Sequence, residues 1–311
     1  MKLSIDTEII VVGSHAPGLF MRVKRIPHAG ETVIGWDFHE PKDGGKGSNQ
    51  AISAALLGGK VSFVGCVGKD RVGQDGERWM MEAGVDTSWL RKHDTVPTSV
   101  GFILLNEDGI PAMVSSYGAN AEITRDQIDQ AYDSMANAKV MLTQFEIPVE
   151  IAMYATRKGR EHGLTTIVNP APATKHSLEG LDLATLLVPN ETEAKVLLGI
   201  NPNAIIDFEK LAMDLKQKSQ VECVIVTLGE NGAIGIDQQG TWKVTPPKVE
   251  IVDTSGAGDV FCAALAVAIV RGNDFRTASN WACQAASLSV TKPGTIPSYP
   301  TISEINQLLI N

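Results

Sequence analysis

The sequence contains few cysteines and no long apolar run. Its four cysteines each lie in an apolar context and none forms a CxxC pair, which favours buried free thiols in a reducing cytoplasm over disulfides or a cysteine metal site. No apolar run approaches the ~20 residues of a membrane span. The short run Ile9–Val12 is expected to be a buried strand and not part of a signal peptide.

Several familiar catalytic patterns are also missing. A glycine loop of the form G-x-x-x-x-G-K followed by Ser or Thr is absent, which excludes a Walker-type enzyme, and SGAGDVF lacks the third glycine of the dinucleotide fingerprint. Neither HExxH nor G-x-S-x-G occurs. The six histidines lack metal-ligand spacing, and we expect most of them at the surface or in loops. The net charge of -9 argues against a nucleic-acid or anionic-membrane surface, but not against a small anionic ligand.

Strand-like and helix-like apolar patterns alternate along the chain. Short β-branched runs that are apolar on both faces, as in a covered parallel sheet, occupy residues 9–13, 61–65, 140–144, 165–169, 185–190 and 224–229. Helical patterns cover 47–58, 71–84, 149–162, 191–198, 206–218, 256–271 and 275–291. This order predicts an α/β fold: a doubly wound, mostly parallel sheet flanked by helices.

Two segments, 19–39 and 98–118, alternate in the manner of half-buried strands, and the second turns at Glu107-Asp108-Gly109, a hairpin signal. Because both interrupt the α/β pattern, we expect a single domain spanning 1–311 with a small antiparallel β lid formed by insertions at about 14–43 and 96–120. Such a lid would cover the carboxyl edge of the sheet, where ligands bind. A plain extension of the sheet is the alternative.

The segment IVDTSGAGDVF, residues 251–261, runs into an apolar helical pattern. Gly256, Ala257 and Gly258 are small, so a phosphate could approach the unpaired backbone N–H groups of the helix start, where the helix dipole also attracts an anion. Asp259 lies in the first turn and could accept a proton from an attacking hydroxyl. These groups suit phosphoryl transfer. The alternative is a carboxylate that only favours the helix dipole.

A second glycine-rich stretch is DGGKGSNQA, residues 43–51. Gly44 and Gly45 would let a polar ligand reach the backbone, and Asn49 offers both a donor and an acceptor, which suits sugar hydroxyls. The alternative is a tight turn in which Ser48 or Asn49 caps a helix.

Two weaker motifs follow buried runs. In VPNETEA, residues 188–194, Asn190 and Glu193 are three apart, and Glu193 could order a Mg²⁺ shell through water or belong to a helix-capping arrangement. VTLGENGA, residues 226–233, suits either a loop at the edge of a nucleotide site or a plain hairpin.

These stretches, in this order and together with NPAPA at 169–173, closely resemble the ribokinase family of carbohydrate kinases, and the likeness runs from about residue 9 to the C-terminus. NPAPA and PNETEA are most similar to the ribokinase branch. The resemblance implies an ATP-dependent sugar kinase that transfers the γ-phosphoryl group of ATP to a hydroxymethyl group of a pentose or related sugar, with Mg²⁺ and K⁺ as cofactors.

The resemblance also implies roles for individual residues. Asp259 would be the catalytic base, and Gly256, Ala257 and Gly258 would form the anion hole for the transferring phosphoryl group. The implied sugar contacts are Gly44, Gly45, Asn49, Glu146 and Asp259. The residues implied on the nucleotide side are Asn190, Glu193, Thr227, Gly229 and Gly232, with Glu193 holding Mg²⁺ through water.

A monovalent cation, usually K⁺, accompanies the anion hole in this family. The positions that match its ligands are Asp253, Ser255, Ser289, Lys292, Gly294 and Ser298. A lone carboxylate surrounded by backbone carbonyls suits a large, weakly hydrated cation better than Mg²⁺. The alternative for Asp253 is a turn cap. Since exposed β edges tend to be covered, we also expect a homodimer formed through the lid strands.

One departure from the family concerns the sugar. Ribokinases usually carry a GSxNxD-like stretch whose asparagine and aspartate bind sugar hydroxyls, but the matching positions in VGSHAPGLFM are Ala16 and Gly18. A site built around hydroxyls depends on such partners for discrimination. The departure therefore leaves open a kinase for a non-ribose sugar or a nucleoside, with His15, Trp36 or His39 as candidates to fill the gap.

Overall fold

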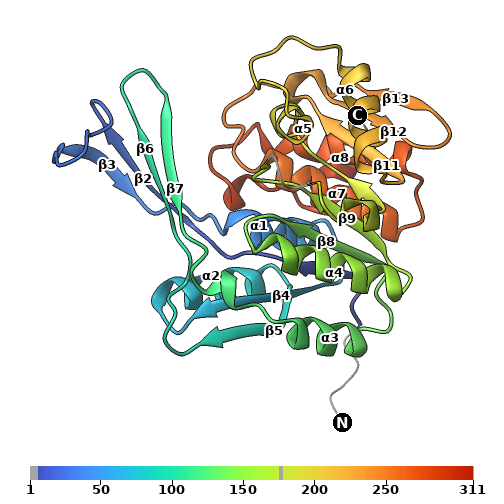
Figure 1. The fold of residues 1–311 in the computed structure, drawn as a ribbon, viewed down its shortest axis with the longest axis horizontal. Coiled ribbons are helices and arrows are strands. Elements are labelled where there is room, and N and C mark those ends of the chain that lie inside the picture. The colour runs from blue at the N-terminus through green and yellow to red at the C-terminus, as the bar shows by residue number, and fades with distance from the viewer. Residues whose placement is uncertain (1–5, 175–177, 311) are drawn as a thin grey trace.

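The computed structural model describes residues 6–174 and 178–310 (Figure 1). Its main sheet has nine strands in the order β13-β12-β11-β10-β9-β8-β1-β4-β5. The strands are β1 (Ile9–Val12), β4 (Val61–Gly68), β5 (Asp86–His93), β8 (Val140–Gln144), β9 (Thr165–Asn169), β10 (Leu186–Leu187), β11 (Cys223–Thr227), β12 (Ala233–Ile236) and β13 (Thr241–Val244). All pairings from β5 through β11 are parallel, and the last two are antiparallel. The predicted α/β fold with a mostly parallel sheet is confirmed.

Chain order reverses beside β1. The chain runs from β1 outward to β4 and β5, and later strands are added on the other side, beginning with β8 next to β1. In doubly wound sheets ligands bind at the carboxyl ends of the strands at such a reversal. The loops that follow Val12 and Gln144 therefore lie where a ligand is expected.

Helices cover both faces of this sheet (Figure 1). The helices are α1 (Gly45–Leu56), α2 (Arg71–Glu82), α3 (Arg125–Ser134), α4 (Val149–Glu161), α5 (Glu191–Leu198), α6 (Phe208–Ser219), α7 (Ala257–Val270), α8 (Phe275–Ser289) and α9 (Ile302–Ile310). One apolar core contains side chains from α1, α7 and α8, and a second contains side chains from α3, α4 and α6. The helices expected from the sequence are all present, with boundaries that shift by one or two residues.

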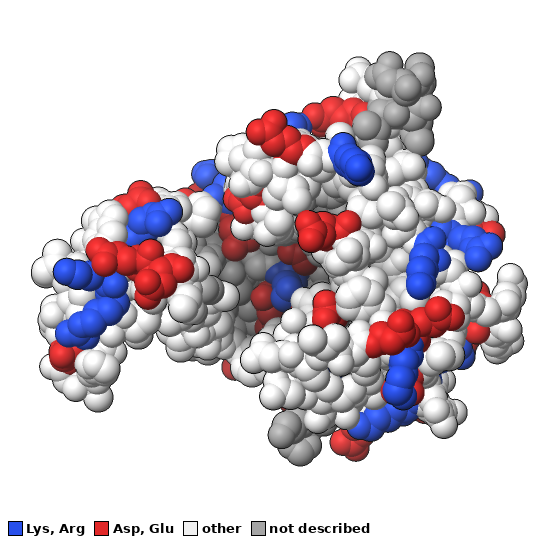
Figure 2. All heavy atoms as spheres, turned by 90° about the horizontal axis from the view of Figure 1, so that it is seen from above, with Lys and Arg blue, Asp and Glu red and all other residues white. Residues whose placement is uncertain are grey.

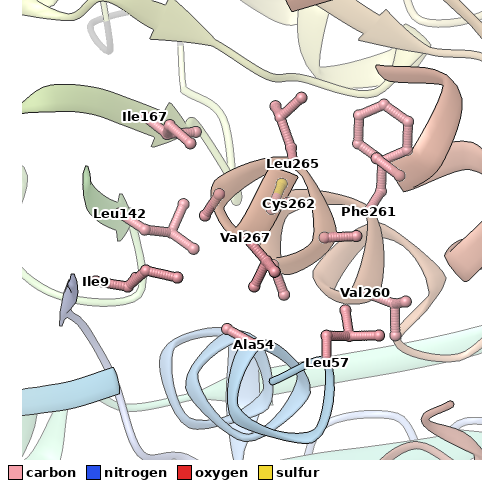
Figure 3. Close-up of a cluster of buried hydrophobic side chains, with 14 of the residues drawn as sticks. Ile9, Ala54, Leu57, Leu142, Ile167, Val260, Phe261, Cys262, Leu265 and Val267 are labelled. Atoms are coloured by element: carbon pink, nitrogen blue, oxygen red, sulfur yellow. The ribbon is translucent and has the colours of Figure 1, made fainter. Parts of the chain in front are cut away.

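Helix α7 lies inside the first core. Nearly all of its side chains are apolar, so it can be buried around its whole circumference. Figure 3 shows it between the sheet residues Ile9, Leu142 and Ile167 and the α1 residues Ala54 and Leu57. This packing fixes the start of α7, and so the segment that precedes it, relative to the sheet and α1.

A separate sheet of four strands projects from one side of this body (Figure 1). Its strands are β2 (Gly18–Val23), β3 (Gly35–His39), β6 (Gly101–Leu105) and β7 (Pro111–Ser115), in the order β3-β2-β6-β7. The β2–β3 and β6–β7 pairings are antiparallel, whereas β2 and β6 pair in parallel. The predicted turn is present, with Gly109 at φ 76 and its N–H donating to Asn106 O over 3.0 Å. We call this sheet the lid sheet.

All four cysteines are free and buried, as expected. Among the described residues, no helix has both the length and the apolar character needed to cross a membrane. Nor do the described residues contain a group of three or more His, Cys, Asp or Glu side chains placed to hold a metal ion.

Candidate active site

Glu146 anchors the loops that follow β1 and β8. Its Oε2 accepts hydrogen bonds from Ser14 Oγ at 2.7 Å and from the backbone N–H of Lys46 at 2.8 Å. Ser14 Oγ also accepts from Gly47 N at 3.2 Å. Burial raises the pKa of the Glu146 carboxyl, although the charge of Lys46 and these hydrogen bonds oppose the shift. The glycine-rich start of α1 is thereby attached to the sheet at the point where chain order reverses.

Asp259 lies in the first turn of α7 and is buried, with 7% of its surface exposed. Gln50 Nε2 donates to one carboxylate oxygen at 3.0 Å and Asn49 Nδ2 donates to the other at 3.3 Å. Burial raises the pKa of Asp259, an effect that nearby Lys46 and the two amides partly offset. The structure thus brings Asn49 and Asp259, both predicted as site residues, into contact.

A relay of amides holds Gln50 in the orientation that Asp259 needs. Gln144 Nε2 donates to Gln50 Oε1 at 2.5 Å, so the Gln50 amide nitrogen is left to donate to Asp259 and, at 3.2 Å, to Asn169 Oδ1. All four side chains are buried. Gln50 and Gln144 were not among the predicted site residues. For Gln50 a usable signal was a polar residue on the buried face of a helix, whereas Gln144 ends strand β8.

Lys46 was also missed by sequence reasoning. Burial alone would lower the pKa of its ammonium, but the carboxylates of Asp259, Glu146 and Glu193 outweigh burial and raise the pKa. Among the described residues its ammonium has no ion-pair partner and no side-chain hydrogen bond. Figure 2 shows a hollow between the lid sheet and the body, with acidic and basic side chains on its floor. The ammonium is thus charged and has donors available for a ligand.

The start of α7 is open on one side and closed on the other. Gly256, the N-cap, has φ 75, and a Cβ there would lie 2.7 Å from Tyr299 Oη. A Cβ at Gly258 would meet no atom within 4 Å. The Tyr299 hydroxyl is buried and has no hydrogen-bond partner among the described residues, and burial raises its pKa well above the ordinary value. Within the described part of the chain the helix start therefore combines unpaired N–H groups at Gly256 and Gly258, open space at Gly258 and an unpaired hydroxyl beside Gly256, while the Ala257 N–H donates to Thr254 O at 3.3 Å.

The predicted cation residues come from two loops that meet at Asp253. Its Oδ1 accepts from Ser255 N and its Oδ2 from Gly294 N, both at 2.9 Å. Burial would raise the pKa of Asp253, but these backbone N–H groups lower it. Asp253 therefore caps its turn, as the alternative interpretation expects. It also holds the two loops close together, as a cation site requires.

Three other predicted cation residues have side chains with partners inside the protein. Ser289 Oγ donates to Ala286 O and Ser298 Oγ to Thr295 O, both at 2.8 Å. Lys292 Nζ pairs with Glu304 at 2.6 Å, and its positive charge cannot bind a cation. Lys292 could therefore contribute only its backbone carbonyl, whereas the two serines have carbonyl oxygens and hydroxyl lone pairs.

Asn190 and Glu193 form a capping box at the start of α5. Asn190 Oδ1 accepts from Glu193 N at 2.8 Å, and Glu193 Oε2 accepts from Asn190 N at 2.9 Å. Burial raises the pKa of Glu193, and its charge interacts with those of Lys46 and Asp259, so the three groups lie within electrostatic reach of one another. Glu193 therefore has the capping role that the alternative interpretation expects. Its other carboxylate oxygen, Oε1, takes no part in the capping box.

The predicted nucleotide loop lies beside this capping box. Asn190 forms an isolated parallel bridge with Thr227, which places the end of β11 next to the start of α5. Gly229 and Gly232 follow, with φ 57 and φ 82. The segment forms the β11–β12 hairpin, as one of the two sequence readings expected. The structure thus brings Asn190, Glu193 and Thr227 together at one edge of the sheet.

Comparison with known proteins shows to which family the chain belongs. The model of the pfkB family carbohydrate kinase matches residues 6–302. The chain belongs to this family. It is 37% identical over 303 residues to a ribokinase of Bacillus subtilis, covering 97% of this chain and 99% of that one. It is 32% identical over 307 residues to a deoxyribokinase of Salmonella typhi, covering 97% and 98%.

A solved structure supports the same assignment. The Arabidopsis thaliana ribokinase complexed with ribose and ATP superposes with a TM-score of 0.85 at 30% identity, covering 97% of this chain and 98% of that one. The ribokinase-like branch inferred from the sequence is confirmed. The protein is an ATP-dependent sugar kinase, a phosphotransferase that acts on an alcohol group.

The two small residues singled out above, Ala16 and Gly18, lie in the loop after β1 and at the start of β2. Ala16 N donates to Gly44 O at 2.8 Å, so the two loops lie side by side. His15 does not fill the space left by Ala16 and Gly18, because its buried ring forms a hydrogen bond with Ser48 Oγ at 2.9 Å and packs against Gly76. Burial lowers the pKa of His15 to about 4.

Two other candidates for the gap lie on the lid sheet. Trp36 and His39 both belong to β3 and are exposed, and the His39 ring packs against Phe20.

Proposed function

We propose that this sugar kinase phosphorylates a hydroxymethyl group of a neutral pentose or deoxypentose, with Asp259 as the base that accepts the hydroxyl proton. The observation that supports this most directly is the placement of the Asp259 carboxylate. It is buried, held by Asn49 and Gln50, and it lies next to the open helix start at Gly258. Burial makes its pKa higher than usual, and a base with a raised pKa accepts a proton more readily.

The sugar would lie over the start of α1. Gly45 has φ 70, and a Cβ there would lie 2.9 Å from Glu146 Oε2, so a larger residue would fill the space beside Glu146. Glu146 Oε2 is engaged by Ser14 and Lys46, which leaves Oε1 to accept from a sugar hydroxyl. Gly44, Gly45 and Asn49 would supply the other contacts.

The start of α7 would bind the transferring phosphoryl group. Among the described residues the backbone N–H groups of Gly256 and Gly258 make no hydrogen bond and could donate to it, whereas the Ala257 N–H donates to Thr254 O at 3.3 Å and would have to turn to the ligand. The helix dipole would stabilise the charge of the phosphoryl group. The Lys46 ammonium, which has no ion-pair partner within residues 6–174 and 178–310, would add a positive charge on the sugar side. Together these groups would keep the hydroxyl and the phosphoryl group aligned.

Mg²⁺ would bind near Asn190 and Glu193 and neutralise charge on the phosphates of ATP. The Glu193 oxygen outside the capping box and the proximity of Lys46 and Asp259 support this placement. Thr227, Gly229 and Gly232 would border the nucleotide.

The test is ADP release with a panel of pentoses, hexoses, deoxy sugars and nucleosides. We expect the highest kcat/KM with a pentose or deoxypentose. The nucleoside alternative would be favoured if nucleosides were turned over faster than free sugars, because nucleosides need an apolar base pocket that a free sugar does not.

We further propose that K⁺ binds between the loops that meet at Asp253 and supports the geometry of the α7 start. The support is a partly buried carboxylate that joins both predicted ligand segments through backbone N–H groups. Activity is expected to rise when Na⁺ buffer is replaced by K⁺ buffer, and an equal activity in both buffers would remove the site.

The assembly we propose is a homodimer formed through the lid sheet, in a reducing cytoplasm where the four thiols stay unpaired. Large exposed apolar side chains gather on the lid sheet and its flanks, namely Ile34, Trp36, Phe38, Phe102, Met113 and Val114. Such a patch is typical of an interaction surface. Light scattering should give the mass of two chains, and a monomeric mass would contradict the proposal.

A further inference from the structure

Asp43 directly precedes Gly44 and Gly45 at the start of α1. Its Oδ1 accepts a hydrogen bond from Asn49 Nδ2 at 2.7 Å. The same Asn49 nitrogen donates to Asp259 Oδ2 at 3.3 Å. Asp43 is therefore separated from the proposed base by one amide group. Its charge contributes to the raised pKa of Asp259, which also indicates that the two carboxylates lie close together.

The other oxygen of Asp43 faces the gap at Gly18. A Cβ built on Gly18 would lie 3.6 Å from Asp43 Oδ2 and 3.0 Å from Ile103 Cδ1. The Asp43 carboxylate thus borders the space that a side chain at position 18 would enter. Among the described residues Oδ2 receives no hydrogen bond, and the residue is only half-buried, so a ligand can reach it.

Charge limits what that ligand can be. Asp43, Glu146 and Asp259 place three carboxylates around the start of α1, against the ammonium of Lys46. A neutral hydroxyl donates readily to a carboxylate, whereas an anionic group would be repelled by it.

We infer that Asp43 is a sugar-binding residue, whose Oδ2 accepts a hydrogen bond from a hydroxyl of a neutral sugar at the place left open by Gly18. This inference rests on the proposed function, because it assigns a contact within the same sugar site. It makes Asp43 a determinant of specificity: sugars with a hydroxyl in that direction are preferred, and sugar phosphates and sugar acids are rejected.

The test uses Asp43→Asn, which keeps an amide oxygen for the hydrogen bond from Asn49 and removes the charged acceptor. For the best sugar of the panel, we expect KM to rise about tenfold to a hundredfold, with kcat and the KM of ATP nearly unchanged. For the deoxy analogue that lacks the contacted hydroxyl, Asp43→Asn and the wild type should have equal KM. Asp274→Asn, at the exposed N-cap of α8, is the matched control.

Three results would overturn the inference. One is an unchanged sugar KM in Asp43→Asn, and another is an equal penalty for every deoxy analogue, which would show that Asp43 acts only through Asn49. The third is faster turnover of an anionic sugar than of any neutral one. Sugar binding measured by calorimetry without ATP, on folded wild type and Asp43→Asn, gives the same comparison. It also separates this inference from the proposed function, because a wild type that binds sugars without releasing ADP would contradict only the latter.

Discussion

Two glycines at the start of α7 provide a matched pair of substitutions. Gly256 has φ 75, and a Cβ there would lie 2.7 Å from Tyr299 Oη and 2.8 Å from Thr295 Cγ2. The left-handed backbone costs an alanine about 1–2 kcal/mol, and overpacking costs about 1–3 kcal/mol more. Gly256→Ala should therefore lower the free energy of unfolding by roughly 2–5 kcal/mol.

Gly258→Ala should behave in the opposite way. A Cβ there meets no protein atom within 4 Å, and its φ is not left-handed, so the substitution should raise stability by about 0.4–1 kcal/mol through the unfolded state. The new methyl group would occupy the space where we place the phosphoryl group. Losing one such donor contact typically costs about 10²-fold to 10³-fold in kcat.

The assay for both variants combines urea unfolding with ADP release. We expect Gly256→Ala to unfold at lower urea than the wild type, and Gly258→Ala to unfold at slightly higher urea than the wild type and to be far less active. Full activity of Gly258→Ala would refute the placement of the phosphoryl group at the start of α7. Wild-type stability of Gly256→Ala would refute the steric argument about Tyr299.

Three further predictions concern charged side chains. Asp259→Asn should lower kcat by about 10²-fold to 10⁴-fold. The control Asp274→Asn, whose asparagine still caps α8, should leave kcat unchanged. Equal kcat values for the two variants would contradict the assignment of Asp259 as the base. Since the base works deprotonated and burial raises its pKa, kcat/KM measured against pH should fall as pH drops through that raised pKa. Lys46→Met removes a positive charge that lowers the pKa of Asp259, whereas Lys46→Arg keeps it. The fall in kcat/KM should therefore begin at a higher pH in Lys46→Met than in Lys46→Arg. Identical pH profiles of the two variants would count against this coupling. Glu193→Gln should keep the capping box and the unfolding midpoint but raise the Mg²⁺ concentration for half-maximal activity, and an unchanged Mg²⁺ requirement would leave Glu193 with a capping role alone.

Much of the main sheet and its helices could be predicted because periodicity reports burial. Runs such as IIVV are apolar on both faces, and the helices between them are amphipathic or, for α7, apolar throughout. Strand β5 was missed because it lies at the edge of the sheet, where Arg91, Lys92 and His93 are tolerated. Helix α3 was missed because few of its residues are apolar, although Thr124 caps it.

In the lid sheet, periodicity predicts the strands but not which strands pair. Alternation predicted strands at both insertions, and the Asp108-Gly109 turn was found where expected. The parallel pairing of β2 with β6 joins residues about 80 positions apart, and only tertiary contacts select that partner.

The site residues also differ in whether the sequence alone could reveal them. Glycines and acids at helix starts carry a local signal, and they led to Asp259, Asn49 and Gly256. Gln144 and Asp43 acquire their roles only through neighbours distant in sequence, at Gln50 and Gly18. Contacts of this kind depend on the folded chain and leave no pattern in a single sequence.

The most direct test of the account is ³¹P NMR of the enzyme with ATP and a neutral sugar, either ribose or 2-deoxyribose. The wild type should convert the γ-phosphate resonance of ATP into a sugar phosphomonoester resonance, and Asp259→Asn should do so at least 100-fold more slowly. Release of inorganic phosphate alone, or equal formation of the sugar ester by both proteins, would contradict the account.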